Sequence, residues 1–156
     1  MRMPTITTHI DTVDLRISQT LERNGIWAMR YALAFVFVVF GILKPLGVSP
    51  AAGLVLQTVN WVPLVSAEFM LHAIGWWEVA IGISFLARPL LRLAILLLAM
   101  QMVGTFLPLV VLPDVTWQSN FAPTMEGQYI LKNLLIIAGA MIVGGTARTR
   151  NDSRRL

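Results

Sequence analysis

The stretch HAIGWWEVAIGISFLA, His72–Ala87, is apolar enough for a membrane-spanning helix, yet a glutamate lies near its centre. A charged side chain at the middle of a bilayer costs about 2.5–3.5 kcal/mol on insertion scales. Glu78 must therefore face protein rather than lipid. The rest of the chain has to supply the surface that it faces.

The composition is that of a membrane protein. Of the 156 residues, 56% are hydrophobic and only 13% are charged, whereas a soluble domain is about half apolar and a quarter charged. We therefore expect an all-α membrane protein, a four-transmembrane-helix bundle over residues 26–146. Its spans are the four apolar runs that approach the roughly 20 residues a bilayer requires: 27–46, 69–87, 90–112 and 128–145. Because the chain has no cysteine, disulfides and thiol chemistry are excluded.

The distribution of positive charge predicts the topology. All ten arginines lie before or at the start of the first run, between the second and third runs, or after the fourth. The long connections 47–68 and 113–127 contain no Lys or Arg. By the positive-inside rule, both termini are cytoplasmic and the two long loops face outward. The same placement argues against nucleic-acid binding, despite the net charge of +4.

Segments outside the four runs also have helical patterns. Residues 1–25 carry an apolar stripe at helical spacing, which predicts an amphipathic helix in the cytoplasmic headgroup region; packing on a partner or on the bundle's own loops fits equally well. The first outer loop is too apolar for a solvated loop and predicts a short helix beginning at Ser49-Pro50. Residues 147–156 form a basic cytoplasmic tail. The apolar stripe of residues 1–25 consists of Ile6, Ile10, Val13, Ile17 and Leu21.

Each predicted span has one stripe of small or polar residues. The stripes are Arg30, Ala34, Phe37, Gly41 and Lys44; His72, Gly75, Glu78 and Gly82; Gln101, Gly104, Thr105 and Pro108; and Gln128, Lys132, Leu135 and Gly139. Since lipid favours the apolar sides, we expect the stripes to meet inside the bundle. Small residues let helix backbones approach closely, which gives a helix-packing role to Gly41, Gly75, Gly82, Gly104 and Gly139.

Two lysines are possible partners for Glu78. Lys44 lies about 21 Å along its helix from Arg30, and Lys132 about 24 Å from Arg148, so both belong to the outer half. The cluster is either a structural ion pair or a functional site, since intramembrane ionisable groups often mark function. Two lysines against one carboxylate leave a surplus positive charge for an anionic or quinone-like oxygen. The other candidate ligand or ion-pair residues are Arg30, His72 and Gln101.

The same residues predict a ligand site between the first, second and fourth helices. An apolar pocket with a few convergent polar groups is the usual form of such a site. We expect it beneath loop 51–65, with Trp61, Trp76 and Trp117 as its roof. No metal-ligand spacing and no self-contained catalytic motif is present, so no metal site is expected.

Three segments resemble the DoxX-like membrane proteins, and the YkgB-type branch in particular. They are RYALAFVFVVFGILKPLG (30–47), GWWEVAIGISFLARPLLRLAILLLAMQMVGTFLPLVVLP (75–113) and PTMEGQYILKNLLIIAGAMIV (123–143), and the resemblance covers about residues 26–145. The matching positions are Arg30, Gly41, Lys44, Glu78, Gly82, Glu126–Tyr129, Lys132 and Asn133. The resemblance implies a small four-helix protein of the bacterial inner (plasma) membrane, linked to quinone-coupled sulfur oxidation or to resistance to reactive chlorine or oxidative stress.

The expected function is a redox- or stress-associated membrane component with a quinone- or small-molecule-binding pocket. Such a chain lacks an electron carrier of its own and would act as an accessory subunit of a quinone-linked oxidoreductase, or as a homo-oligomer. Two alternatives stay open at the level of sequence. One is a small proton-linked transporter with Glu78 as its titrating group, and the other is a structural or assembly subunit of a membrane complex.

Overall fold

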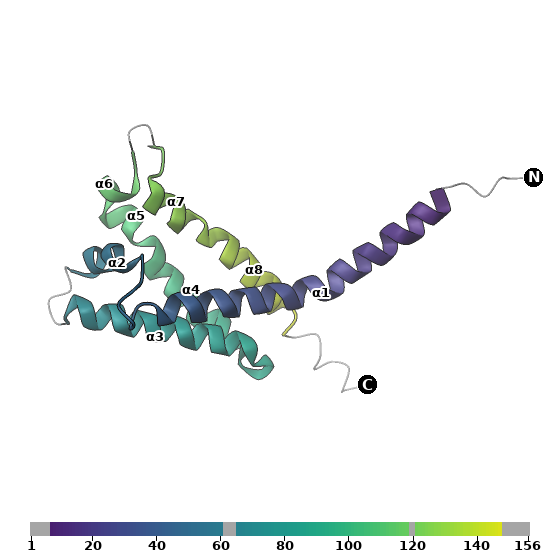
Figure 1. Cartoon of the computed structure of the whole chain (residues 1–156), viewed down its shortest axis with the longest axis horizontal. Coiled ribbons are helices and arrows are strands. Elements are labelled where there is room, and N and C mark those ends of the chain that lie inside the picture. Colours follow the sequence, from purple (N-terminus) through teal and green to yellow (C-terminus); the bar gives the residue numbers. More distant parts are fainter. Residues whose placement is uncertain (1–6, 61–64, 119–120, 148–156) are drawn as a thin grey trace, which may run out of the picture.

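The computed structural model describes residues 7–60, 65–118 and 121–147, and within these ranges the regular elements are all helices (Figure 1). They are α1 (Thr7–Ile42), α2 (Ala52–Val59), α3 (Ala67–Leu86), the 3-10 helix η1 (Arg88–Leu90), α4 (Leu91–Phe106), α5 (Pro108–Val111), α6 (Pro113–Thr116), α7 (Met125–Leu131) and α8 (Asn133–Gly145). One isolated β-bridge joins Trp117 and Pro123. The predicted all-α class is confirmed.

Four helical stretches are long and apolar enough to cross a membrane, which makes the chain a multi-pass membrane protein. They are Val13–Ile42, Ala67–Leu86, Arg88–Val111 and Met125–Gly145. The predicted four-helix bundle is therefore confirmed. The third and fourth spans are interrupted, at Leu107 before Pro108 and at Lys132. Proline has no backbone N–H to continue the α4 hydrogen-bond ladder, which accounts for the first interruption.

α1 and α3 pack with their backbones in direct contact. A Cβ added to Gly41 would lie 2.8 Å from the backbone oxygen of Gly75, and a Cβ on Gly75 would lie equally close to that of Gly41. One on Gly82 would lie 2.8 Å from the backbone oxygen of Ala34. No other residue type fits these three positions without moving a helix, so the predicted packing role of these glycines is confirmed.

The remaining two predicted packing glycines differ from each other. A Cβ on Gly139 of α8 would lie 2.7 Å from the sulfur of Met29, so α8 packs closely against α1 as predicted. A Cβ on Gly104 would meet nothing within 4 Å. The predicted packing role of Gly104 is wrong, because this glycine borders a cavity instead of a neighbouring helix.

The apolar core fills the part of the bundle nearer η1. Its side chains come from α1, α3, α4 and α8, and its largest fully buried members are Phe85, Ile81 and Val143. Arg30 lies at this end and donates hydrogen bonds from Nε to the Phe85 carbonyl and from Nη2 to that of Leu86, the latter at 2.6 Å. These two carbonyls end α3 and have no partner within the helix, so Arg30 joins α1 to the end of α3.

The predicted boundary at residue 25 is not a break in the helix. α1 runs without interruption from Thr7 into the first span, and its N-terminal part extends away from the bundle (Figure 1). No proline breaks residues 7–42. Val13, Ile17 and Leu21 are exposed. Ile6 of the predicted stripe lies outside the described residues, whereas the exposed Val13, Ile17 and Leu21 belong to an extension of the helix of the first span rather than to a separate helix, and they do not pack on the bundle's own loops.

The short helix predicted in the first long loop is confirmed as α2. It begins after Ala51, two residues later than the predicted N-cap Ser49, whose carbonyl accepts a hydrogen bond from the Ala52 N–H at 3.1 Å. α2 packs beside α3. The predicted basic tail falls almost entirely in residues 148–156, outside the described residues.

Candidate functional site

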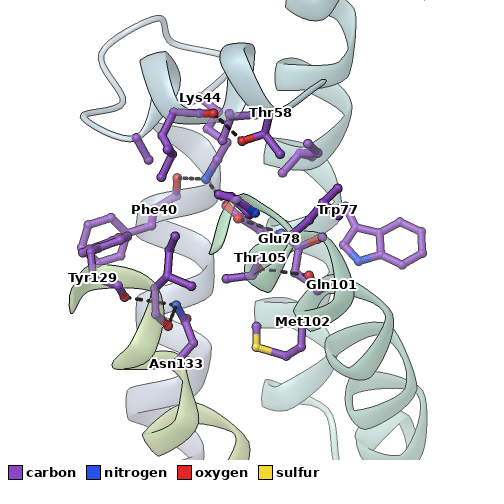
Figure 2. A pocket seen from close by; sticks show the side chains of 18 of the residues that line it. Phe40, Lys44, Thr58, Trp77, Glu78, Gln101, Met102, Thr105, Tyr129 and Asn133 are labelled. Atoms are coloured by element: carbon purple, nitrogen blue, oxygen red, sulfur yellow. Dashed lines mark hydrogen bonds and ion pairs between the residues drawn. The ribbon is translucent and has the colours of Figure 1, made fainter. Parts of the chain in front are cut away.

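A cavity of about 460 Å³ lies among α1, α2, α3, α4 and the α7–α8 span. Most of its lining is apolar, including Val36, Ile74 and Ile136. α2 contributes Leu54, Val55 and Thr58 to the lining. The polar side chains that line the cavity come from several helices, and Figure 2 labels them: Lys44, Thr58, Glu78, Gln101, Thr105, Tyr129 and Asn133.

Three of these side chains form a hydrogen-bonded group, which we name the polar triad: Lys44, Glu78 and Gln101 (Figure 2). The Lys44 ammonium forms an ion pair with Oε2 of Glu78. Gln101 Nε2 donates to Oε1 of the same carboxylate at 3.0 Å. The side chains of Lys44 and Glu78 are only 6% and 14% exposed. The triad thus joins the end of α1 to α3 and α4 in a largely buried place.

The glycine contact between α1 and α3 places the lysine. Lys44 lies one turn beyond Gly41, and its Cβ would be 2.8 Å from a Cβ on Gly75. Glu78 is one helical turn from Gly75 on the same face. Because the two backbones touch here, the lysine side chain reaches the carboxylate; its Nζ also donates to the Phe40 carbonyl at 3.4 Å.

α3 and α4 are joined by a second polar contact beside the triad. The indole N–H of Trp77 donates to the Leu97 carbonyl at 3.3 Å. One turn further along α4, the Gln101 carbonyl accepts a hydrogen bond from the Thr105 hydroxyl at 3.0 Å. The Trp77 contact holds the α4 segment that carries Gln101 against α3, whereas the Thr105 hydrogen bond lies within α4.

The triad retains hydrogen-bonding capacity toward the cavity. A lysine ammonium has three donors, and two of those on Lys44 have acceptors in the described residues. The side-chain carbonyl of Gln101 accepts no hydrogen bond from those residues, and carboxylate oxygens have further lone pairs. A ligand in the cavity would therefore find both a donor and an acceptor on the same wall.

The prediction that Lys132 joins this group is wrong. Lys132 is exposed, does not line the cavity and forms no ion pair with the described residues. The predicted stripe of its span faces away from the bundle at Gln128, Lys132 and Leu135, and Leu135 is 75% exposed. The predicted surplus positive charge is absent from the polar triad, which pairs one lysine with one glutamate.

The inward face of the fourth span lies one residue further along the chain. Tyr129, Asn133 and Ile136 line the cavity. Asn133 Nδ2 donates to the carbonyls of Ile130 at 2.9 Å and Tyr129 at 3.3 Å, across the junction of α7 and α8. This face was not predicted from the sequence, because Lys132 was taken to lie on the side of the helix that faces the bundle. The i, i+4 spacing of a tyrosine and an asparagine was the available signal.

The other predicted site residues lie elsewhere. Arg30 is buried within α1, near the η1 end of the bundle, where it binds the end of α3. His72 is exposed and does not line the cavity. Of the predicted candidates, the structure therefore brings together Lys44, Glu78 and Gln101 alone.

The predicted tryptophan roof is also wrong. Trp76 is 57% exposed, and the Trp117 indole donates to the Leu109 carbonyl at 3.0 Å; neither lines the cavity. Trp61 lies outside the described residues. The place expected for these rings is taken by the apolar side of α2.

Comparisons with protein-family models, with curated proteins and with solved structures found no match for this chain. The cavity, the polar triad and the sequence motifs are therefore the features that bear on its function.

Proposed function

We propose that this chain is a DoxX-like protein of the bacterial inner membrane that binds a neutral, hydrophobic molecule of the quinone class in the cavity. It serves there as a redox- or stress-associated component. One observation carries the proposal: a mainly apolar cavity of about 460 Å³ has the polar triad on its wall. Small-molecule pockets measure about 300–1,000 Å³ and combine apolar walls with a few placed polar groups.

The charge of the site favours a neutral ligand. Lys44 and Glu78 compensate each other, so a permanently charged ligand would bring an unpaired charge into a largely apolar place, which is costly. A neutral ring with polar oxygens carries no such cost. A site for a neutral ligand therefore replaces the anion-attracting site expected from two lysines.

The hydrogen-bonding capacity of the triad suits both states of a quinone. A quinone oxygen accepts, and Lys44 or the amide of Gln101 would donate to it. The oxygen of the reduced form is a hydroxyl and donates, and Glu78 or the Gln101 carbonyl would accept from it. The chain's own residues bind and orient the ring in this proposal, and electron transfer is assigned to an oxidoreductase partner subunit.

Quinone retention in the purified protein tests the proposal. A leucine at Gly104 would extend into the cavity, because space is open at that position. Gly53 of α2 is the matched control, since it is also open but does not line the cavity. We expect wild type and Gly53→Leu to copurify with a quinone detected by mass spectrometry, and Gly104→Leu to lose most of it.

Two results would contradict the proposal. One is a wild-type protein that carries no quinone and takes up none when a short-chain ubiquinone is added. The other is equal retention by Gly104→Leu and wild type. If liposomes containing the protein instead show solute or proton flux that Glu78→Gln abolishes, the transporter alternative replaces the quinone proposal.

A further inference from the structure

A second hollow lies at the opposite end of the bundle from α2 and does not involve the polar triad. This groove, of about 670 Å³, lies among α1, the turn between α3 and α4, and the residues that follow α8. Three arginines line it: Arg23, Arg30 and Arg88. One acidic side chain, that of Glu22, also lines it.

A tryptophan holds two of these arginines together. The guanidinium carbon of Arg88 lies 4.2 Å from the ring centroid of Trp27, and that of Arg30 lies 5.4 Å from it. Both distances are in the range of cation–π contacts. Arg30 is also fixed by its hydrogen bonds to the last carbonyls of α3. Two like charges are thus held at one ring in a fixed arrangement.

No carboxylate of the described residues lies at ion-pair distance from these charges. Throughout the part of the chain that the structure describes, the ion pair between Lys44 and Glu78 is the one formed. Arg88 accordingly contacts an aromatic ring but pairs with no acid there. Bringing arginines together without an acid is unfavourable unless an anion completes the group.

The groove lies at the depth of lipid headgroups. α3 ends at Leu86 and the next span begins at Arg88, so Arg88 stands where two spans leave the membrane. Trp27 fits the tryptophans that gather at membrane interfaces. Apolar Ile26 and Leu91 line the groove beside the arginines and would contact the hydrocarbon next to a headgroup.

We propose that this groove binds a phosphate oxyanion, supplied by the headgroup of an anionic phospholipid or by free inorganic phosphate. Guanidinium groups bind phosphate oxygens through paired, parallel hydrogen bonds. The guanidinium group of Arg88 has no carbonyl partner among the described residues and supplies the paired donors. Arg30 adds a fixed charge beside it, and Arg23 lies on the preceding turns of α1. The site is independent of the proposed quinone cavity.

The test compares Arg88→Gln with Arg92→Gln. Arg92 is exposed, lies four residues further along at the start of α4 and does not line the groove, so both variants remove one charge from the same end of the bundle. Each protein is placed in nanodiscs of phosphatidylcholine containing phosphatidylglycerol, and the bound lipids are counted by native mass spectrometry. A second series, in pure phosphatidylcholine, measures the shift in melting temperature with inorganic phosphate against chloride at equal ionic strength.

We expect wild type and Arg92→Gln to retain phosphatidylglycerol in preference to phosphatidylcholine, and Arg88→Gln to lose that preference. Arg88→Lys keeps the charge but lacks the paired donors, and we expect it to retain the lipid less well than wild type. A phosphate-dependent shift lost in Arg88→Gln alone identifies free phosphate as the source. If neither probe separates folded Arg88→Gln, or the milder Arg88→Lys, from Arg92→Gln, the contacts of Trp27 with the arginines are structural and the proposal is overturned.

Discussion

Glu78 shows how a single charged residue is accommodated in a membrane span. Its carboxylate has one oxygen on Lys44 and the other on Gln101, so the charge is matched and both oxygens are hydrogen-bonded. Breaking one side of a buried ion pair costs more than removing both charges, because the remaining ion is left without a partner. The pair therefore matters for stability chiefly because the loss of either side chain would leave the other charge buried without a partner.

Glu78→Gln should destabilise the protein more than its shape change suggests. The amide leaves the buried Lys44 ammonium unpaired, and losses of this kind are typically about 3–5 kcal/mol. Lys44→Met should be comparably damaging because it leaves the carboxylate alone. The double variant should be more stable than either single variant, as judged by unfolding in detergent.

Lys132→Met is the control for this cycle. It removes the other lysine of the chain, but from an exposed position without an ion pair among the described residues. We expect it to unfold like wild type. A Glu78→Gln protein as stable as wild type, or a double variant that simply sums the two single losses, would refute the role given to the pair.

Among the elements, α1 and α3 form the contact on which the site depends. Gly41 and Gly75 allow their backbones to touch, and the same approach brings Lys44 beside Glu78. The hydrophobic effect does not drive helices together inside a membrane, because lipid tails are as apolar as the side chains. Close van der Waals packing at small residues is therefore a main source of helix association. The packing of two helices and the assembly of the polar triad are thus one event.

Gly75→Ala should weaken both the packing of α1 against α3 and the polar triad. Its Cβ would lie 2.7 Å from Cδ of Pro45 and 2.8 Å from the Gly41 oxygen, so the helices must separate, and overpacking of this kind costs about 1–3 kcal/mol. Gly104→Ala is the matched control, since its Cβ meets open space. Thermal unfolding of the two variants should therefore differ clearly. Equal melting temperatures would show that the glycine contact is not needed.

The sequence predicted the inward faces of α1 and α3 correctly. In α1 and α3 a charged residue and its glycines share one stripe, and those stripes do meet. In the fourth span the predicted stripe also combines a charge, Lys132, with a glycine, Gly139, but only the glycine packs against α1. A lysine is long enough to lie on the outside of a helix and carry its ammonium to an interface. The face was therefore chosen wrongly, and Tyr129 and Asn133 were missed.

At the scale of the whole molecule, the sequence predicted the number of spans, the α2 helix and a pocket beneath the first long loop, but neither the residues of the fourth span that line the cavity nor the continuity of α1. Hydropathy fixes which segments cross, because each must satisfy its backbone internally. The lining of a cavity depends instead on which side chains fail to fill the space between helices, as at Gly104, and this lining cannot be deduced from the pattern of one helix. The continuity of α1 on the N-terminal side of residue 25 was not predicted, because the polar composition of residues 1–25 was taken to separate them from the helix of the first span.

The orientation of the whole molecule in the membrane is the last prediction. Four spans place both termini on one side, and the arginines at the α3–α4 turn, together with the arginine-free connections 47–68 and 113–127, predict that this side is cytoplasmic. Because the chain has no cysteine, single cysteines report position without a background. Cysteines at Gln57 and Gln118, both exposed, should react with an impermeant maleimide in intact cells. One at exposed Ser18 should react only after the cells are permeabilised. The reverse pattern would turn the quinone cavity toward the cytoplasm and place the phosphate groove on the outer face, and the positive-inside argument for this chain would fail.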